Sequence, residues 1–179
     1  RRFGRVGMPG APFLRGDRLT LRTVTPADHE FLLEHGNDPA VREGAPTPTP
    51  VDEDALAAFL DDDESVQFLP CRDETPVGFV FLFGIEPHRD HAELGCWIAP
   101  DEQGEGYATE ASELCLDHAF ADLGLHKVLA RVFEHNDASM AVLDKLGFQR
   151  EGRLREHDYI RGAYRDTLLF GLLAEEWRA

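Results

Sequence analysis

Lysine is scarce in this sequence: only Lys127 and Lys145 occur, and arginine supplies the rest of the strongly basic side chains. The 179 residues include 34 acidic side chains against 18 lysines and arginines, which gives a formal net charge of −16. A nucleic-acid-binding protein needs a basic surface for the phosphate backbone, so this charge argues against that class. Acid-rich, lysine-poor surfaces suit high salt, where repulsion between carboxylates is screened. The composition favours a salt-adapted protein, with an acidic mesophilic protein as the alternative.

Long apolar runs are also missing. No stretch approaches the roughly 18 consecutive apolar residues of a transmembrane helix. The basic residues 1–7 are not followed by an apolar segment, as they would be in a secretory signal. We therefore expect a cytoplasmic protein that does not act at a membrane. Residue 1 is arginine, so the first residues are interpreted as a tag or extension, with Met8 as a candidate native start.

Cysteine and histidine show no metal-ligand spacing. Cys71, Cys96 and Cys115 are odd in number, and the eight histidines form no HExxH or His-x-x-x-His pair. We expect free, mostly buried thiols and no bound metal, with a catalytic cysteine as the minor alternative.

The length suits one domain with a real core, and the hydrophobic fraction of 42% is ordinary for a globular protein. Residues 1–16, rich in glycine, arginine and proline, predict a flexible N-terminal tail, and residues 17–179 a single domain.

Apolar periodicity and turn residues predict an α/β (α+β) chain in the order β-α-α-β-β-β-α-β-α-β-β, a mixed sheet with helices packed on it. The expected strands are Arg18–Arg22, Val66–Leu69, Val77–Ile85, His91–Ile98, Lys127–Phe133, Arg153–Ile160 and Tyr164–Leu173. The expected helices follow Thr25-Pro26, cover Asp52–Leu60 and Tyr107–Leu123, and begin after an Asn136 or Asp137 cap; Gly44–Pro50 is expected to be a loop.

The most informative segment runs from the strand ending at Trp97-Ile98 through the glycine-rich turn Gln103–Gly106 into a helix. Such a turn exposes backbone N–H groups at the positive end of the helix dipole, where phosphate groups bind. Gly104 and Gly106 allow a close approach because they carry no Cβ.

Three interpretations of this turn compete. In the first, the glycines only allow the backbone to turn from strand to helix, and the turn binds no ligand. A Rossmann dinucleotide site requires glycine or alanine at position 109, where this chain has Thr109. It also requires the loop to follow the first strand of a repeated parallel βαβ unit, whereas here three successive strands precede the loop. The Rossmann interpretation is therefore disfavoured. The third is the acetyl-CoA loop of the GNAT superfamily, Gln/Arg-x-x-Gly-x-Gly/Ala, which Gln103–Ala108 matches position for position.

The wider chain also resembles that superfamily, in particular its RimJ/RimL-type branch, named for ribosomal-protein N-terminal acetyltransferases. The second signature is Asn136–Phe148 and the third the closing hairpin Tyr159–Asp166. The order of elements is similar across residues 17–175. The resemblance implies a mostly antiparallel central sheet of about seven strands flanked by about four helices.

The same resemblance implies that acetyl-CoA is the co-substrate and that no covalent acyl-enzyme forms. Its pantetheine arm would pair with the strand ending at Trp97-Ile98, and a backbone N–H near Cys96–Ile98 would stabilise the oxyanion. Asn136 would bind the arm, and Ser139 would protonate or hydrogen-bond the leaving thiolate. The implied cofactor-binding residues are Trp97, Ile98, Ala99, Gln103, Gly104, Glu105, Gly106, Tyr107, Ala108, Thr109, Asn136 and Ser139.

Glu93 is the first candidate for the base that deprotonates the amine, directly or through a water, because it lies in the strand that leads to the site. It can equally be a strand carboxylate in an ion pair. Ser139 and Asn136 can likewise be simple helix-start residues, and Tyr107 is expected to pack rather than to catalyse.

One position departs from the resemblance: relatives commonly carry lysine or arginine between the two glycines, where this chain has Glu105. A carboxylate beside a pyrophosphate is unfavourable in dilute salt and less so in molar salt if it points outward.

The expected activity is an N-acetyltransferase acting on a primary amine, such as a protein N-terminal amine. The alternatives are a small-molecule acceptor (a polyamine, an amino acid or an antibiotic) and a non-catalytic CoA-binding sensor module. The acceptor pocket is expected between the first two helices, the Gly44–Pro50 loop and the terminal hairpin. A monomer or homodimer is expected.

Overall fold

The computed structural model describes residues 9–45, 49–85, 88 and 90–177. The strands are β1 (Pro12–Arg15), β2 (Thr20–Arg22), β3 (Val66–Arg72), β4 (Thr75–Pro76), β5 (Gly78–Phe83), β6 (His91–Ile98), β7 (Lys127–Phe133), β8 (Gln149–Ile160) and β9 (Ala163–Leu173). The helices are α1 (His29–Gly36), α2 (Pro39–Arg42), α3 (Glu53–Leu60), α4 (Tyr107–Asp117), α5 (Asp137–Lys145) and α6 (Ala174–Trp177).

The strands form one mixed sheet in the order β1-β2-β3-β5-β6-β7-β9-β8, and β4 pairs with β3 at its edge. Every described pair of neighbours is antiparallel except β6 with β7, which run parallel. The predicted fold class, a mixed and mostly antiparallel sheet with flanking helices, is confirmed.

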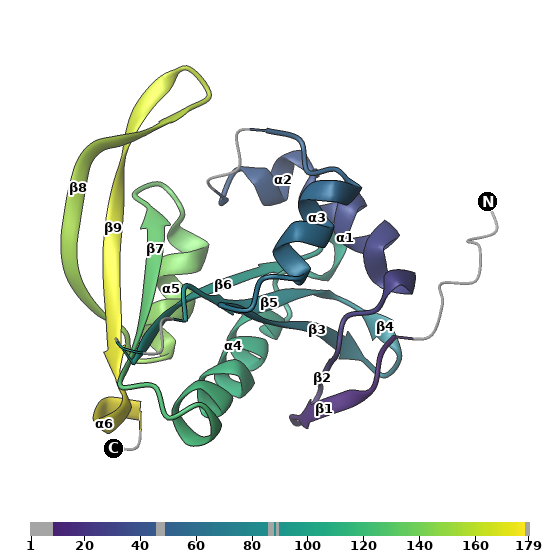
Figure 1. Ribbon diagram of the computed structural model, residues 1–179. Coiled ribbons are helices and arrows are strands. Elements are labelled where there is room, and N and C mark those ends of the chain that lie inside the picture. The colour runs from purple at the N-terminus through teal and green to yellow at the C-terminus, as the bar shows by residue number, and fades with distance from the viewer. Residues whose placement is uncertain (1–8, 46–48, 86–87, 89, 178–179) are drawn as a thin grey trace.

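Two apolar clusters lie on opposite faces of the sheet. Helices α4 and α5 cover one face, where Ala92, Leu94 and Ile98 of β6 are buried. Helices α1 and α3 cover the other face, where Trp97 packs against the second cluster. Figure 1 shows α4 below the strands and α1 to α3 above them. The alternation of β6 therefore directs its odd and even residues to different layers, as its sequence predicts.

The predicted tail of residues 1–16 is wrong for its last part, because Pro12–Arg15 form β1 and pair with β2. Phe13 holds this edge strand by stacking on Phe68, with ring centroids 5.4 Å apart. A four-residue strand beginning at proline carries too little alternation to predict, and the stacking partner is far along the chain. Residues 1–8, with the expected tag and the Met8 start, lie outside the described residues.

Two smaller differences concern helices. The loop expected at Gly44–Pro50 is preceded by the unpredicted helix α2, although Asp38-Pro39 is a recognisable start signal: the Asp38 side chain accepts from Ala40 N at 2.7 Å. The helix expected to reach Leu123 is α-helical only to Asp117 and continues as the π-helical turn His118–Asp122.

Candidate active site

The central feature is a wedge between β6 and β7. These two strands pair only at three positions, from His91 opposite Lys127 to Glu93 opposite Leu129. Beyond Glu93, β6 stays paired with β5 and β7 stays paired with β9, and the two diverge (Figure 1). Within the described chain, the edge of β6 from Leu94 to Ile98 has no strand partner on the β7 side. A ligand with strand-like amide groups could pair with this edge.

The turn that follows β6 needs glycine for its backbone. Gly104 has φ +84° and Gly106 has φ +82°, both in the left-handed region that residues with a Cβ rarely adopt. The Gln103 side chain closes the turn because its Nε2 donates to the Ile98 carbonyl at 3.0 Å. The turn therefore has a defined shape in the free protein, with the start of α4 held directly beside the end of β6.

The first turn of α4 offers free backbone donors. Its first intrahelical bond runs from Glu110 N to Gly106 O at 3.2 Å, and the Gly106 N-cap supplies no side-chain acceptor. The N–H groups of Tyr107, Ala108 and Thr109 therefore point out of the helix start without an intrahelical acceptor, at the positive end of its dipole. The Tyr107 side chain itself is buried in the core, as expected for a packing residue.

The predicted cofactor residues at the end of β6 are mostly enclosed. Ile98 and Ala99 are 5% and 4% exposed, and the Ala99 N–H is already used by the Val77 carbonyl at 2.9 Å. Ala99 thus retains no free amide for a ligand. Trp97 is half-buried on the opposite face, where it stacks with Phe31 at 5.9 Å between ring centroids.

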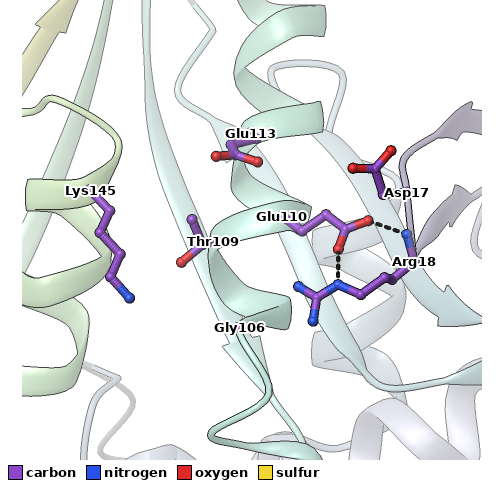
Figure 2. Close-up of a pocket in the computed structure, with 7 residues that line it drawn as sticks. All are labelled: Asp17, Arg18, Gly106, Thr109, Glu110, Glu113 and Lys145. Atoms are coloured by element: carbon purple, nitrogen blue, oxygen red, sulfur yellow. Dashed lines mark hydrogen bonds and ion pairs between the residues drawn. The ribbon is translucent and has the colours of Figure 1, made fainter.

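A buried carboxylate ties this turn to the N-terminal hairpin. Glu110 Oε1 accepts from Arg18 N at 2.7 Å, and Oε2 accepts from Arg18 Nε at 2.9 Å (Figure 2). Oε1 also accepts from Leu19 N at 2.9 Å. Burial works to raise the pKa of Glu110, but these hydrogen bonds and the Arg18 charge outweigh it, and the pKa is lowered. The Arg18 guanidinium also donates to the Glu105 carbonyl at 2.7 Å and lies 5.2 Å from the Tyr107 ring centroid.

The second predicted signature begins α5 at the far side of the wedge. Asn136 is the N-cap: its Oδ1 accepts from Ser139 N at 3.1 Å. The helix-cap role of Asn136 is thus observed. Ser139 is half-buried, and its hydroxyl makes no hydrogen bond among the described residues.

Glu93 stands where the wedge opens. Its Oε2 lies 3.0 Å from Arg131 Nε, and the two side chains are 15% and 58% exposed. Burial raises the pKa of Glu93, while the charge of Arg131 and its hydrogen bond oppose that rise. The ion pair expected as one interpretation is therefore present. A carboxylate with a raised pKa at the mouth of a wedge also suits a general base.

The terminal hairpin, one of the segments expected to build an acceptor pocket, contacts the unpredicted helix α2 and the residue that follows it. Arg161, at the tip of the β8–β9 hairpin, donates to the Pro39 carbonyl at 3.3 Å and lies 3.4 Å from the Glu43 carboxylate. A Cβ built on Gly44 would meet the Asn136 side-chain amide at 2.8 Å. Gly44, after α2, thus lies beside the start of α5, and the hairpin tip lies beside α2. The acceptor pocket stays a prediction, and residues 46–48 of the expected loop lie outside the described residues.

The cysteines are poor nucleophiles. All three are free, and burial raises the pKa of the Cys96 and Cys71 thiols to about 12 and that of Cys115 above its ordinary value. Cys96, in the wedge strand, therefore remains a thiol at neutral pH, which argues against a covalent acyl-cysteine. Among the described residues no cluster of three or more metal-ligating side chains occurs, and no helix is long and apolar enough to span a membrane.

Several residues of this site were missed in the sequence. The contacts of Arg18 with Glu105 and Glu110, and that of Arg131 with Glu93, join different elements, and no local pattern reveals them. Lys145 lines a pocket beside α4; it lies within the second signature, Asn136–Phe148, and is one of only two lysines, but no role was predicted for it.

Known proteins resemble this chain in sequence and in fold. A family profile described as "Acetyltransferase (GNAT) domain" matches residues 18–149. Spermidine N(1)-acetyltransferase of Escherichia coli (strain K12) is 31% identical over 126 residues, which cover 70% of this chain and 68% of that protein.

Two solved structures extend the likeness over most of the chain. The spermidine N-acetyltransferase from Vibrio cholerae, in complex with CoA and spermine, superposes with a TM-score of 0.84 at 27% identity, covering 90% of this chain and 99% of that one. Mycobacterium smegmatis RimJ, in complex with CoA-disulfide, gives a TM-score of 0.79 at 26% identity over 90% of this chain and 84% of that one. The family match and the likeness to these solved structures agree with the resemblance seen in the glycine turn. The chain belongs to the GNAT family of acetyl-CoA-dependent N-acetyltransferases.

Proposed function

We propose that this chain transfers the acetyl group of acetyl-CoA to a primary amine by direct attack within the wedge between β6 and β7. The observation that carries the proposal is the divergence of these strands after Glu93. The free amides of α4 lie at one face of the sheet, and Glu93 and Trp97 lie on the other. A thioester entering from the α4 side would pair with the edge from Leu94 to Ile98 and present its carbonyl near the face where an acceptor can enter.

In this proposal the amine nitrogen attacks the thioester carbonyl, and Glu93 takes the proton that the amine loses, directly or through a water. The C–S bond then breaks, and the Ser139 hydroxyl donates a hydrogen bond to the leaving thiolate, which takes its proton from solvent or from the Ser139 hydroxyl as that hydroxyl regains one from solvent. Three features support direct transfer: the raised pKa of Cys96, the uncommitted hydroxyl of Ser139 and the raised pKa of Glu93.

The acceptor that we favour is a protein N-terminal amine, as in the RimJ/RimL-type branch. A specific observation supports a polyamine as the second candidate, since one structural neighbour is a spermidine N-acetyltransferase solved with spermine. Both acceptors are cationic, and a chain of net charge −16 attracts cations at long range in dilute salt. Because the proposed reaction consumes an intracellular thioester, we also propose a cytoplasmic location.

The test combines binding with turnover. Calorimetric titration with acetyl-CoA establishes binding, and release of the CoA thiol is then followed with spermidine and with a panel of short peptides bearing free N-termini. Glu93→Gln and Ser139→Ala should lower kcat at least tenfold while changing the Kd for acetyl-CoA by less than threefold. Glu151→Gln, which removes an exposed carboxylate paired with Lys127, is the control and should leave both unchanged.

The alternative of a non-catalytic CoA sensor makes a different prediction. Saturable binding without thiol release for any amine, in low and in molar salt, would favour the sensor and overturn the catalytic roles of Glu93 and Ser139. Failure to bind acetyl-CoA in either condition would overturn the proposed function as a whole.

A further inference from the structure

The face of β6 that looks away from α4 has a gap in its row of side chains. By the alternation of the strand, Glu93, Gly95 and Trp97 share the face that α1 and α3 cover, opposite to Leu94 and Ile98 (Figure 1). Gly95 is the middle one of the three and brings no side chain. On this face, the centre of the edge proposed to pair with the thioester is therefore covered only by what a neighbouring element supplies.

Phe81 of β5 supplies that cover. It lies directly opposite Gly95 in the antiparallel ladder. A Cβ built on Gly95 would meet Cε2 and Cζ of the Phe81 ring at 2.3 Å each, which is much closer than two unbonded carbon atoms can approach. The end of the ring thus occupies the space in which a side chain at position 95 would begin.

Aromatic neighbours fix the Phe81 ring in this place. Its centroid lies 5.1 Å from that of Phe59, on α3, with an interplanar angle of 82°. Phe79 and Phe83, on the same strand, lie at 5.1 and 5.7 Å. Ring contacts at such distances are favourable, so the position of Phe81 over Gly95 is set before any ligand binds.

The ring lies between a carboxylate and an indole. Glu93 and Trp97 flank the position that Phe81 covers. Phe31 of α1 stacks on Trp97 with ring centroids 5.9 Å apart, so α1 covers the indole side. Phe81 itself is only half-buried. On this face, aromatic carbon beside the Glu93 carboxylate is therefore open to a ligand.

Aromatic carbon beside a carboxylate suits an amine that carries apolar carbon. The face of a phenyl ring attracts an ammonium ion and packs against methylene groups, but it offers no partner to a polar group. Desolvation on the ring disfavours the charged form of the amine and so lowers the pKa of its ammonium group. That eases transfer of the amine proton to Glu93, the base of the proposed reaction.

We infer that Phe81 is a specificity-determining residue for the acceptor, because the carbon atoms next to the reacting amine pack on its ring where the ring covers Gly95. The preferred acceptors are primary amines with an apolar chain close to the nitrogen. The alkyl chain of a polyamine and the apolar side chain of an N-terminal residue both supply this chemistry. The inference rests on the proposed function, since it describes the acceptor of the same reaction.

The test measures how turnover depends on the carbon chain of the acceptor. Release of the CoA thiol is followed for ethylamine, butylamine and hexylamine, and for tetrapeptides that differ only in a first residue of glycine, alanine or leucine. In the wild type, kcat/KM should rise roughly two- to threefold for each added carbon in at least one series, because one side of that carbon leaves water. The series that shows the rise identifies the source of the chain.

Phe81→Leu should flatten this rise. Leucine ends at its Cδ atoms, so it has no counterpart of the Cε2 and Cζ atoms that cover Gly95. KM for the longest acceptor should increase roughly fivefold or more, with kcat retained and the Kd for acetyl-CoA unchanged. Phe79→Leu is the matched control: Phe79 packs on the same ring from the same strand but is only 4% exposed, so this variant should keep the wild-type rise.

The wild type alone can overturn the inference, if its kcat/KM does not depend on the chain in either series. The inference also fails if Phe81→Leu keeps the full rise, or if Phe79→Leu loses it equally. In these three cases thiol is still released, so the proposed function survives. No thiol release with any amine would overturn both.

Discussion

Replacing Glu110 by glutamine tests how firmly the first hairpin is joined to the acetyl-CoA turn. The amide oxygen of glutamine can still accept from the N–H groups of Arg18 and Leu19, which both bind Oε1 in the wild type. Its NH2 group would face Arg18 Nε, so one charge-assisted bond becomes a contact between two donors. We expect a loss of about 2 kcal/mol in the free energy of unfolding at pH 7. For a chain of this size that corresponds to a fall in Tm of roughly 4–8 °C.

The pH dependence of this loss has a defined sign. Because the pKa of Glu110 is lowered in the fold from its ordinary value of 4.5, its contribution is fully present above that value. It is lost as the pH falls through the lower folded pKa, where the wild-type side chain becomes a neutral acid like the amide. The stability difference between wild type and Glu110→Gln should therefore be largest near neutrality and shrink in acid.

The measurement is urea unfolding of both proteins between pH 7 and pH 3, followed by circular dichroism. Glu113→Gln is the matched control, since Glu113 lies one turn further along α4, is exposed and makes no ion pair among the described residues. A difference that stays constant with pH, or a Glu110→Gln protein as stable as the control, would refute the assignment of Glu110 as a charged cross-link.

Two further predictions concern activity. Arg131→Met removes both interactions that lower the pKa of Glu93, so that pKa should rise and the acidic limb of kcat/KM should move to higher pH; an unmoved limb would argue against Glu93 as the base. Glu105→Lys should tighten acetyl-CoA binding, mainly at low salt, because it replaces an exposed negative charge beside the free backbone amides at the start of α4 by a positive one. A Kd that is the same as wild type at every salt concentration would contradict this second prediction.

Much of the fold could be predicted because its strongest elements are periodic. The bounds of β6 and β7 were predicted to the residue, and α5 begins at the Asn136 cap, as its sequence indicates. The four-residue elements β1 and α2 were not predicted, because so short a segment shows little periodicity; the three-residue β2 was, because it lies within the alternating segment Arg18–Arg22. The π-helical turn that follows α4 was also not predicted, because its apolar residues continue the spacing of the α-helix.

The site was predictable only where it is local in sequence. The glycine turn is one continuous motif, and its two left-handed glycines follow from it. The partners of its residues are not local: Arg18 reaches Glu105 across 87 positions, and Glu93 meets Arg131 only because β6 and β7 lie side by side. Whether Glu93 acts as a base, and which amine is accepted, are decided by such long-range contacts. No spacing rule in the sequence contains them.

The three residue pairs that join β6 to β7 also make a seam in the sheet. Amide hydrogens of Leu94–Ile98 that face this seam lack a β7 partner, so they should exchange with solvent faster than those bonded to β5. Acetyl-CoA paired with the same edge would hydrogen-bond these amides, much as an added strand would. The co-substrate would then slow amide exchange along the β6 edge and raise Tm as its concentration rises. The bound thioester would then stabilise the sheet as well as take part in the reaction.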